Sequence, residues 1–464
     1  MTSIPGLRNL VLAAAAAVIT SAGAVIVLLN PDDSTRKITG TNDSAPGLAW
    51  SVDAAATYGR GFAEFRDPAS GTEYDMGGPG FVDAGDTLVT VIGVSNGGMS
   101  LQGPMLVGID AATGAQRWQT PAADLGGCGS TPVDGRLVCF TSAPELIGYD
   151  IATGKITRTP TDWNIFAIAT ADDRVYLAEG DVESDDVRVH AGTLADPDAY
   201  WSRAFTMGTA WEDLPANALE VSHGQGVLAL GADLAGFDRA SGDPRWTVGL
   251  DGCSDATETS GALVVRIRTE CRGYRIVGSD LIDRTGRTIA TTDSEIAHTL
   301  SIDLPVDETI PVLLGDSAHD RHTGNRMWTS PDLISTPRET NDHNVDATVG
   351  TATAILGDVA LLRDTVAHTT TGLDMRTGHR LWQAETDRSG TIHGWDGHTV
   401  VLSDYTGLWA VNPWTGETVW DIPFLAVNAD HAAITDGGRL AAHRSGRYTY
   451  ACARTMIGLR PLNR

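Results

Sequence analysis

Short apolar runs separated by turn residues dominate the chain from residue 45 onward. Examples are Arg136–Phe140, Arg174–Leu177 and Thr399–Leu402, each of which follows an Asp-Gly or Asp-Asp pair or lies close behind one. Runs of four to six residues bounded by such pairs are typical of β-hairpins. No amphipathic helical pattern of ten or more residues occurs in this part of the sequence. The pattern therefore predicts an all-β fold.

One segment recurs with fixed internal spacing: Asp, two residues, Thr-Gly, three residues, Trp. Copies, some of them incomplete, begin at Asp110, Asp150, Asp238, Asp320, Asp374 and Asn412. The Asp side chain can accept hydrogen bonds from backbone groups across a turn, and the Gly can adopt a positive φ. We therefore expect a tight hairpin at each copy, followed by a strand whose Trp lies in the core.

The spacing of the copies predicts a β-propeller. Asp110 and Asp150 are 40 residues apart, and each period holds three or four short strands. Degenerate copies occur at Gly192–Trp201 and Asp283–Gly286, and all candidates together would make nine blades. Because Asp283 and Asp320 are only 37 residues apart, we expect them to share one blade. The prediction is eight four-stranded blades, with seven and nine as alternatives.

The two ends of the repeat region are expected to complete one blade together. Met456–Arg460 resembles the strand before a repeat turn, but no outer strand follows it. Gly47–Val52 resembles a Trp-bearing outer strand without a preceding turn, and it can supply the missing one.

The N-terminus predicts a membrane segment. Residues 10–29 carry no charge, and about 20 residues in a helix span the roughly 30 Å hydrocarbon core. We therefore divide the chain into a short cytoplasmic tail (1–9), a signal-anchor helix (10–29), a linker (30–44) and the propeller (45–464). The alternative is a signal peptide cleaved near Ser21–Ala24, which would release a secreted protein.

The cysteines favour an oxidising compartment. Cys128 with Cys139 and Cys253 with Cys271 each have a spacing that suits neighbouring strands, so each pair is a candidate disulfide. Cys452 is left unpaired and is expected to be buried. Disulfides would place the propeller on the extracytoplasmic side of the membrane, which the charges around residues 10–29 do not decide.

Charge and aromatic residues bear on the partner. A formal net charge of −26 argues against nucleic-acid binding, which requires clustered Lys and Arg. Trp395 and Trp414 lie in predicted turns and are candidates for an interaction surface, with packing on their own blade as the alternative.

The repeat resembles the pyrroloquinoline-quinone-like (PQQ-like) propeller repeat over most of residues 45–463. Relatives of this type include quinoprotein alcohol dehydrogenases, which hold pyrroloquinoline quinone and calcium, and the envelope scaffold of the outer-membrane assembly machinery, which has no cofactor. The dehydrogenases stack the quinone on a disulfide between adjacent cysteines, and no two cysteines are adjacent here. The resemblance therefore favours a scaffold without cofactor, metal or catalytic residues that binds an envelope protein or polymer. The alternative is a quinone- or metal-dependent oxidoreductase.

Overall fold

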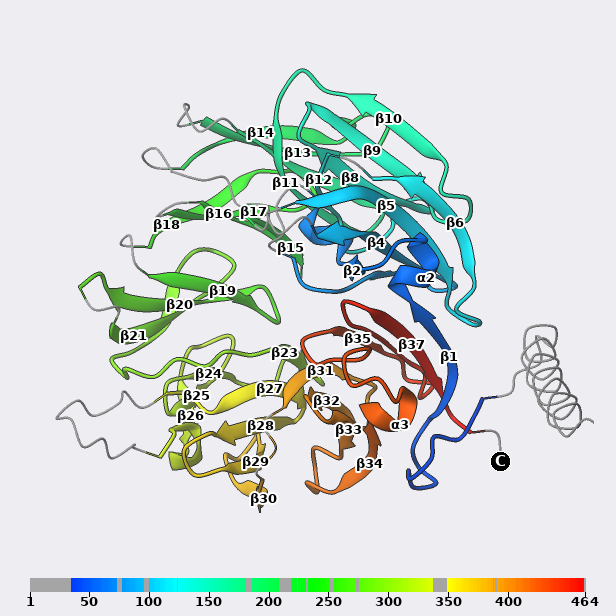
Figure 1. Cartoon of the computed structure of the whole chain (residues 1–464). Helices are drawn as coiled ribbons and strands as arrows, with labels where there is room; N and C mark the ends of the chain where they lie inside the picture. The colour runs from blue at the N-terminus through cyan, green and yellow to red at the C-terminus, as the bar shows by residue number, and fades with distance from the viewer. Residues whose placement is uncertain are drawn as a thin grey trace, which may run out of the picture.

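The computed structural model describes residues 35–462 except 73–76, 96–99, 123, 181–185, 208–217, 223, 231–232, 251–253, 273–274, 337–348, 387 and 389. These residues form nine β-sheets arranged as the blades of a propeller around a central axis (Figure 1). The all-β propeller is confirmed, and the blade number is nine rather than the predicted eight.

Blades 1 to 5 follow one another along the chain. Blade 1 contains β2 (Ala63–Arg66), β3 (Val82–Asp83), β4 (Thr87–Ser95), β5 (Leu101–Asp110) and β6 (Gln116–Pro121); blade 2 contains β7 (Leu125–Cys128), β8 (Arg136–Thr141), β9 (Glu145–Asp150) and β10 (Ile156–Pro160); blade 3 contains β11 (Ile165–Ala171), β12 (Arg174–Glu179), β13 (Asp186–Gly192) and β14 (Trp201–Thr206); blade 4 contains β15 (Leu219–Ser222), β16 (Gln225–Leu230), β17 (Asp233–Asp238) and β18 (Pro244–Gly249); blade 5 contains β19 (Asp255–Thr259), β20 (Leu263–Glu270), β21 (Arg275–Ile282) and β22 (Thr288–Thr292).

Blades 6 to 9 complete the ring. Blade 6 contains β24 (Val312–Leu314), β25 (Ser317–His319) and β26 (Arg326–Thr329); blade 7 contains β23 (Ile302–Pro305), β27 (Ala352–Gly357), β28 (Val359–Asp364), β29 (Thr369–Asp374) and β30 (Arg380–Glu385); blade 8 contains β31 (Thr391–Trp395), β32 (Val400–Asp404), β33 (Gly407–Val411) and β34 (Thr418–Pro423); blade 9 contains β35 (Arg439–Ala442), β36 (Tyr448–Ala451), β37 (Thr455–Arg460) and β1 (Gly47–Asp53). The helices are α2 (Ala54–Tyr58), α3 (Phe424–Val427) and the 3-10 turns η1 (Pro68–Ser70) and η2 (Pro331–Leu333).

The up-and-down order of the strands gives the ring two different faces. The turns from first to second strand and the repeat turns from third to fourth strand emerge on one face, which we call the motif face. The turns from second to third strand and the crossovers between blades emerge on the opposite face, which we call the connection face. Figure 1 shows first strands such as β2, β15, β31 and β35 near the centre and fourth strands such as β1, β6 and β10 at the rim.

The repeat turn forms as its sequence predicts. Asp110 Oδ1 accepts hydrogen bonds from the backbone N–H groups of Ala112 and Thr113 at 2.9 and 2.8 Å and from the Thr113 hydroxyl at 2.9 Å. Gly114 then adopts φ +72°, which other residues adopt only at a cost. The same carboxylate-to-backbone bonds recur at Asp150, Asp238, Asp320 and Asp374.

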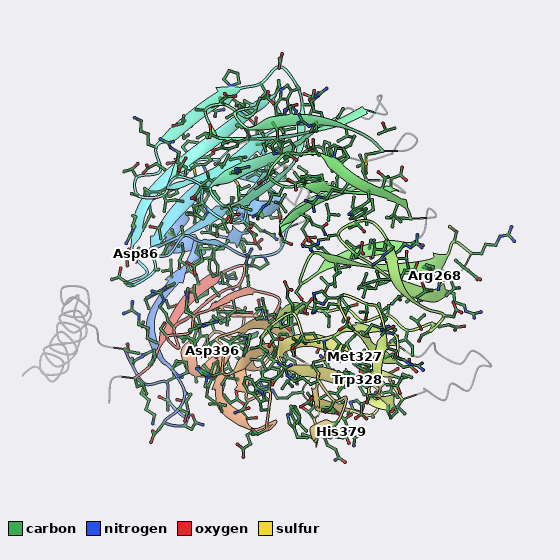
Figure 2. The ribbon with its side chains drawn as sticks, turned by 180° about the vertical axis from the view of Figure 1, so that it is seen from behind. Asp86, Arg268, Met327, Trp328, His379 and Asp396 are labelled. Carbon is green, nitrogen blue, oxygen red and sulfur yellow. A yellow bond between two sulfur atoms is a disulfide. The ribbon has the colours of Figure 1, made fainter. Side chains whose placement is uncertain are left out.

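Where a blade carries the repeat tryptophan, that side chain packs against the next blade, in what we call the indole contact. Its ring covers the Gly of the following Thr-Gly turn, where a Cβ on Gly154 would lie 2.5 Å from Trp118. Its indole N–H donates to a carbonyl in that same turn. Within the described part of the chain this bond occurs five times: Trp50 to Ala111 at 3.2 Å, Trp118 to Ile151 at 2.8 Å, Trp201 to Arg239 at 3.2 Å, Trp328 to Met375 at 2.9 Å and Trp382 to Pro413 at 2.8 Å. The predicted core position is confirmed for Trp50, Trp118, Trp201, Trp246 and Trp420, which are buried. Trp328, on the outer strand β26 (Figure 2), and Trp382 are partly buried.

The two ends of the repeat region close the ring. β1 pairs antiparallel with β37, with Gly47 opposite Arg460, so the predicted closure is confirmed. Part of the segment expected as a linker is also packed on blade 9, because Arg36 bridges Leu48 and Ile38 is buried in the core cluster of blades 8 and 9.

Blades 5 and 6 explain the miscounted blade. The Asp283 turn joins β21 to β22, and the Asp320 turn joins β25 to β26 in a different sheet. Blade 6 is short because it has only three strands, while β23, which precedes it in the chain, pairs in parallel with β27 of blade 7. The sequence spacing was therefore read correctly, but its assignment to one shared blade was wrong.

A buried arginine links the motif-face ends of blades 5 and 6. Arg321 follows the repeat Asp320 and is 6% exposed. Its Nε donates to the carbonyl of Ile310 at 2.5 Å, and its Nη1 donates to the carbonyl of Ser260 in blade 5. On β23, Asp303 Oδ2 accepts hydrogen bonds from the Thr259 hydroxyl and, at 2.9 Å, from the Ser260 N–H.

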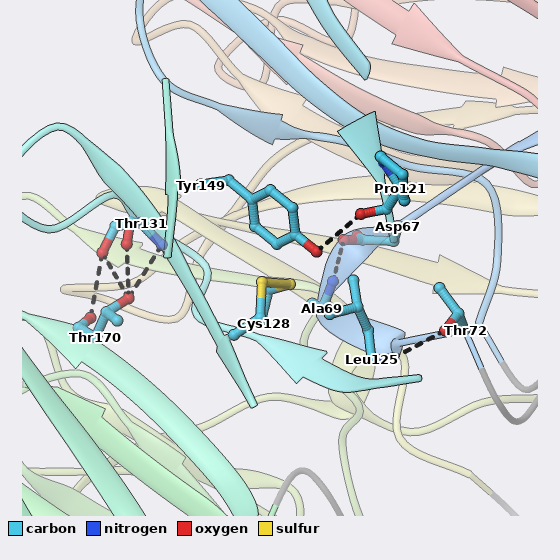
Figure 3. The surroundings of a disulfide bond; sticks show 10 residues. Asp67, Ala69, Thr72, Pro121, Leu125, Cys128, Thr131, Tyr149 and Thr170 are labelled. Carbon is cyan, nitrogen blue, oxygen red and sulfur yellow. Dashed lines mark hydrogen bonds between the residues drawn. A yellow bond between two sulfur atoms is a disulfide. The ribbon is translucent and has the colours of Figure 1, made fainter. Parts of the chain in front are cut away.

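The first predicted disulfide is confirmed. Cys128 and Cys139 face each other on β7 and β8, with Cα atoms 3.9 Å apart, inside the core cluster of blades 1 and 2 (Figure 3). Cys271 is also disulfide-bonded, but Cys253 lies outside the described residues, so that pairing stays a prediction. Cys452 is free and buried, as predicted.

Residues 10–29, the predicted signal-anchor, lie outside the described residues. Within the part of the chain that the structure describes, no helix has both the length and the apolar character needed to cross a bilayer.

Candidate functional site

The two tryptophans proposed as an interaction surface lie together at the interface of blades 7 and 8. Trp395 ends β31 and packs against the core cluster of these two blades. Trp414 lies in the repeat turn of blade 8 and donates its indole N–H to Asp358 Oδ1 at 3.0 Å. Both rings lie near Gly357, where a Cβ would be 3.5 Å from Trp395 and 3.8 Å from Trp414. Each ring therefore contacts the preceding blade, and the interaction role of both residues stays a prediction.

Trp395 also borders a pocket at the inner side of the ring. This cavity of about 400 Å³ lies between β23, β31 and β35 and is lined by Ser301–Leu304, His393–Trp395 and Ala442. Two buried polar atoms on its lining residues, Trp395 Nε1 and Asp303 Oδ1, have no hydrogen-bond partner among the described residues. One is a donor and the other an acceptor.

The histidine of this pocket is held neutral. Burial lowers the pKa of His393 to about 4, although the nearby Asp436 acts in the opposite direction. Its Nε2 shares a hydrogen bond of 2.6 Å with Ser403 Oγ. Because Ser403 is only 1% exposed, its hydroxyl is out of reach of a substrate, and the pair orients the imidazole rather than activating a nucleophile.

A second cavity, of about 390 Å³, separates the outer parts of blades 7 and 8 and is bordered by Trp382 and Trp409. Arg388 spans it with its guanidinium 3.8 Å from the centre of the Trp409 ring. The same guanidinium pairs with Asp404 at 2.8 Å and with Asp421 at 2.6 Å. The two carboxylates neutralise the charge of Arg388, so the role of this arginine in the cavity is structural.

Among the described residues, the most exposed aromatic side chains lie elsewhere, on the connection face. Phe62 is 91% exposed in the crossover from blade 9 to blade 1, and Tyr405 is 82% exposed in the turn between β32 and β33. Leu425 of α3 is 61% exposed and lies beside Tyr405, because the neighbouring Phe424 N–H bonds the Thr406 carbonyl at 2.9 Å. Sequence reasoning missed these residues. The available signal was a single large apolar residue inside a polar turn.

Phe62 is also held in an unusual backbone conformation. Its φ is +62°, a left-handed value that is uncommon for a residue with a large side chain. Such a conformation persists where the surrounding structure enforces it, and here Phe65 N–H and Ala54 N–H bond the carbonyls of Ala453 and Arg454 in blade 9. The neighbouring backbone is therefore anchored while the Phe62 ring points to solvent.

The disulfide does not fit a stacked quinone. Cys128 and Cys139 are 4% and 0% exposed, and they are covered by the apolar residues between blades 1 and 2. A planar cofactor therefore cannot reach the sulfur atoms. Among the described residues, no group of three or more His, Cys, Asp or Glu side chains is arranged to hold a metal ion.

One family model and several solved structures are similar to this chain. A family model described as outer membrane protein assembly factor BamB matches residues 48–339 and 368–455. No curated protein matches the chain. The solved structure of BamB from Moraxella catarrhalis is 18% identical, covering 77% of this chain and 85% of its own, with a TM-score of 0.35. Quinohemoprotein alcohol dehydrogenase from Comamonas testosteroni is 13% identical, covering 91% and 78%, with a TM-score of 0.45. The computationally designed protein Ika8 is 12% identical, covering 86% and 99%, with a TM-score of 0.46. At these identities the similarity concerns the fold alone.

Proposed function

Because this chain belongs to the family of outer membrane protein assembly factor BamB, we propose that it is a binding or scaffolding propeller that docks an envelope protein or polymer on its connection face. In this proposal the uncharged segment 10–29 holds the protein in the membrane, and the propeller lies outside the cytoplasm.

The observation that carries the proposal is the exposure of Phe62, Tyr405 and Leu425 on one face of blades 8, 9 and 1. Large apolar side chains that project from loops of a rigid scaffold are typical of interaction surfaces. Aromatic residues also contribute most strongly to binding when a partner buries them.

The extracytoplasmic location is supported by the cysteines. Disulfides persist in oxidising compartments and are rare where glutathione keeps thiols reduced, and the Cys128–Cys139 bond is buried in the core. Labelling the unreduced protein from intact cells should find only Cys452 reactive after denaturation. Reaction at four or five cysteines would contradict this location.

The partner surface can be tested by co-purification from envelope extract. The full chain carrying Phe62→Ser, Tyr405→Ser and Leu425→Ser together should lose its partner while remaining folded. The control is Met327→Ser with Leu381→Ser, which removes similarly exposed apolar residues, 48% and 44%, from the outer strands β26 and β30 (Figure 2 shows Met327). Equal recovery of the partner with both variants would overturn the proposed surface.

A further inference from the structure

At the inner edge of the interface between blades 4 and 5, two carboxylates face each other. Glu220 lies on β15 and Glu258 on β19, the first strands of their blades. Their neighbours fix this direction: Val227 and Ala256 belong to the apolar cluster between the two blades, and Ala256 and Glu258 lie on the same side of β19.

Two buried oxygen atoms in this place have no donor. Gln225, at the start of β16, is 1% exposed, and its side-chain N–H group lies 3.5 Å from Glu258 Oε1. The Oε1 of Gln225 and the Oε2 of Glu258 are both buried, and neither has a hydrogen-bond partner among the described residues. Leaving a buried acceptor without a donor is unfavourable, so such atoms indicate a missing donor.

The local electrostatics disfavour an unpaired negative charge on Glu258, which a proton or a cation would neutralise. Burial raises the pKa of Glu258 to about 7, the Ser222 hydroxyl and the Gln225 amide oppose this shift, and the charge of Glu220 adds to it. None of these influences is a cation. Glu220 is exposed on the innermost strand, so a solute can reach the group from the centre of the ring.

We propose that Glu220, Gln225 and Glu258 form a binding site for a primary ammonium group. One –NH₃⁺ group has three N–H donors, and these three side chains offer three acceptors: the Glu220 carboxylate, Gln225 Oε1 and Glu258 Oε2. A charged donor forms stronger hydrogen bonds with carboxylates than a neutral one. The chain itself has only two lysines, Lys37 and Lys155, and Lys37 is paired with Asp43. Lys155 lies in the repeat turn of blade 2, away from the interface of blades 4 and 5, so we assign the ammonium to a free amine or to a lysine of a partner.

This site is independent of the proposed partner surface. The β15–β16 turn, which begins after Ser222, and the β19–β20 turn both emerge on the motif face, opposite Phe62 and Tyr405. Loss of either binding activity would therefore leave the other in place, and the two proposals can fail separately.

Calorimetric titration of the full chain in detergent at pH 7 tests the site. The probes are 1,5-diaminopentane and an N-acetyl-lysine amide, compared with tetramethylammonium and calcium chloride. We expect at least one primary amine to bind and to release protons, because burial raises the pKa of Glu258 and this carboxyl must ionise when the ammonium group binds. The proton release appears as an enthalpy that depends on the ionisation heat of the buffer. The relative affinities of the two amines show whether a free amine or a lysine is the source.

Variants complete the test. Glu258→Gln should weaken amine binding by about tenfold or more and abolish proton release, whereas Glu417→Gln, an exposed carboxylate in a repeat turn of blade 8, should change neither. Glu220→Gln provides a second variant at an exposed position, where folding is not at risk. Absence of amine binding, equal binding by tetramethylammonium, preference for calcium, or unchanged binding in both Gln variants would each overturn the assignment.

Discussion

The interface between blades 1 and 2 and the interface between blades 4 and 5 both contain a repeat tryptophan, but they differ in the hydrogen bond of its indole N–H. Trp118 covers Gly154 and donates to the Ile151 carbonyl at 2.8 Å. Trp246 also lies against the Gly of the next turn, but with its Cβ, Cγ and Cδ1 atoms nearest to Gly286, and its buried Nε1 has no partner among the described residues. The reason is the turn: Asp283 to Gly286 is one residue shorter than Asp150 to Gly154. Packing of the ring survives this deletion, whereas the directional hydrogen bond does not.

Removing the complete contact should have the largest effect. Trp118→Ala deletes a ring that is 7% exposed and leaves a cavity between two blades, so we expect a loss of about 3–5 kcal/mol in the free energy of unfolding. Urea unfolding followed by tryptophan fluorescence and by circular dichroism measures it. A loss below about 1 kcal/mol would show that the stability of the propeller does not depend on this contact.

Removing the link between blades 5 and 6 should have the second-largest effect on the free energy of unfolding. Arg321→Met removes the donors to the Ser260 and Ile310 carbonyls and leaves Asp303 without its nearby cation, so we expect a loss of about 3 kcal/mol. The control is Arg326→Met, an exposed arginine at the start of β26 in the same blade, with an expected change within about 0.5 kcal/mol. Equal effects of the two substitutions would show that Arg321 does not stabilise the contact between these blades.

Substitution by phenylalanine isolates the hydrogen bond from the packing. Trp118→Phe loses the bond and leaves the Ile151 carbonyl unpaired, at a cost about 1 kcal/mol greater than that of Trp246→Phe, which removes an N–H that already lacks a partner. Comparing the two urea midpoints measures the difference. A larger loss for Trp246→Phe would contradict the contrast between the two interfaces.

The smallest expected effect is a pH dependence at blades 4 and 5. Because burial raises the pKa of Glu258 to about 7 from an ordinary value of 4.5, the folded state holds this proton more tightly than the unfolded state. Its contribution to stability is fully present below about pH 4.5 and is lost as pH rises through about 7. Since the side chain is partly exposed, we expect about 1 kcal/mol or less across this range. Melting curves of Glu258→Gln should lack this component, and an unchanged slope would contradict it.

The regular blades could be predicted from sequence because each copy of the repeat carries its own local chemistry. Asp110, Thr113, Gly114 and Trp118 specify a turn and an anchor without reference to distant residues. The spacing of Cys128 and Cys139 on one hairpin is similarly local. These features account for the fold, the chain closure and the first disulfide.

The irregular blades depend on contacts that no local pattern records. The pairing of β23 with β27 instead of with blade 6 is determined by tertiary contacts. The sequence around Arg321 predicts a solvated turn residue, although this side chain is buried. Glu220 lies between two apolar residues and Glu258 between two threonines, patterns that predict solvent-facing positions, but in a propeller both faces of a blade are covered by neighbours. The exposure of Phe62 and Tyr405 could not be predicted from the sequence, because a single exposed aromatic residue in a turn has no periodic signal.

The pairing of β1 with β37 has a kinetic consequence. Gly47 must find Arg460 across the whole propeller sequence, so the last ladder to form has the largest sequence separation in the domain. During synthesis the N-terminus emerges first, so blades 1 to 8 can assemble in turn. β1, however, has no partner until β37 has been made. Until then the edge of β1 stays unpaired, and an unpaired strand edge is open to pairing with other chains.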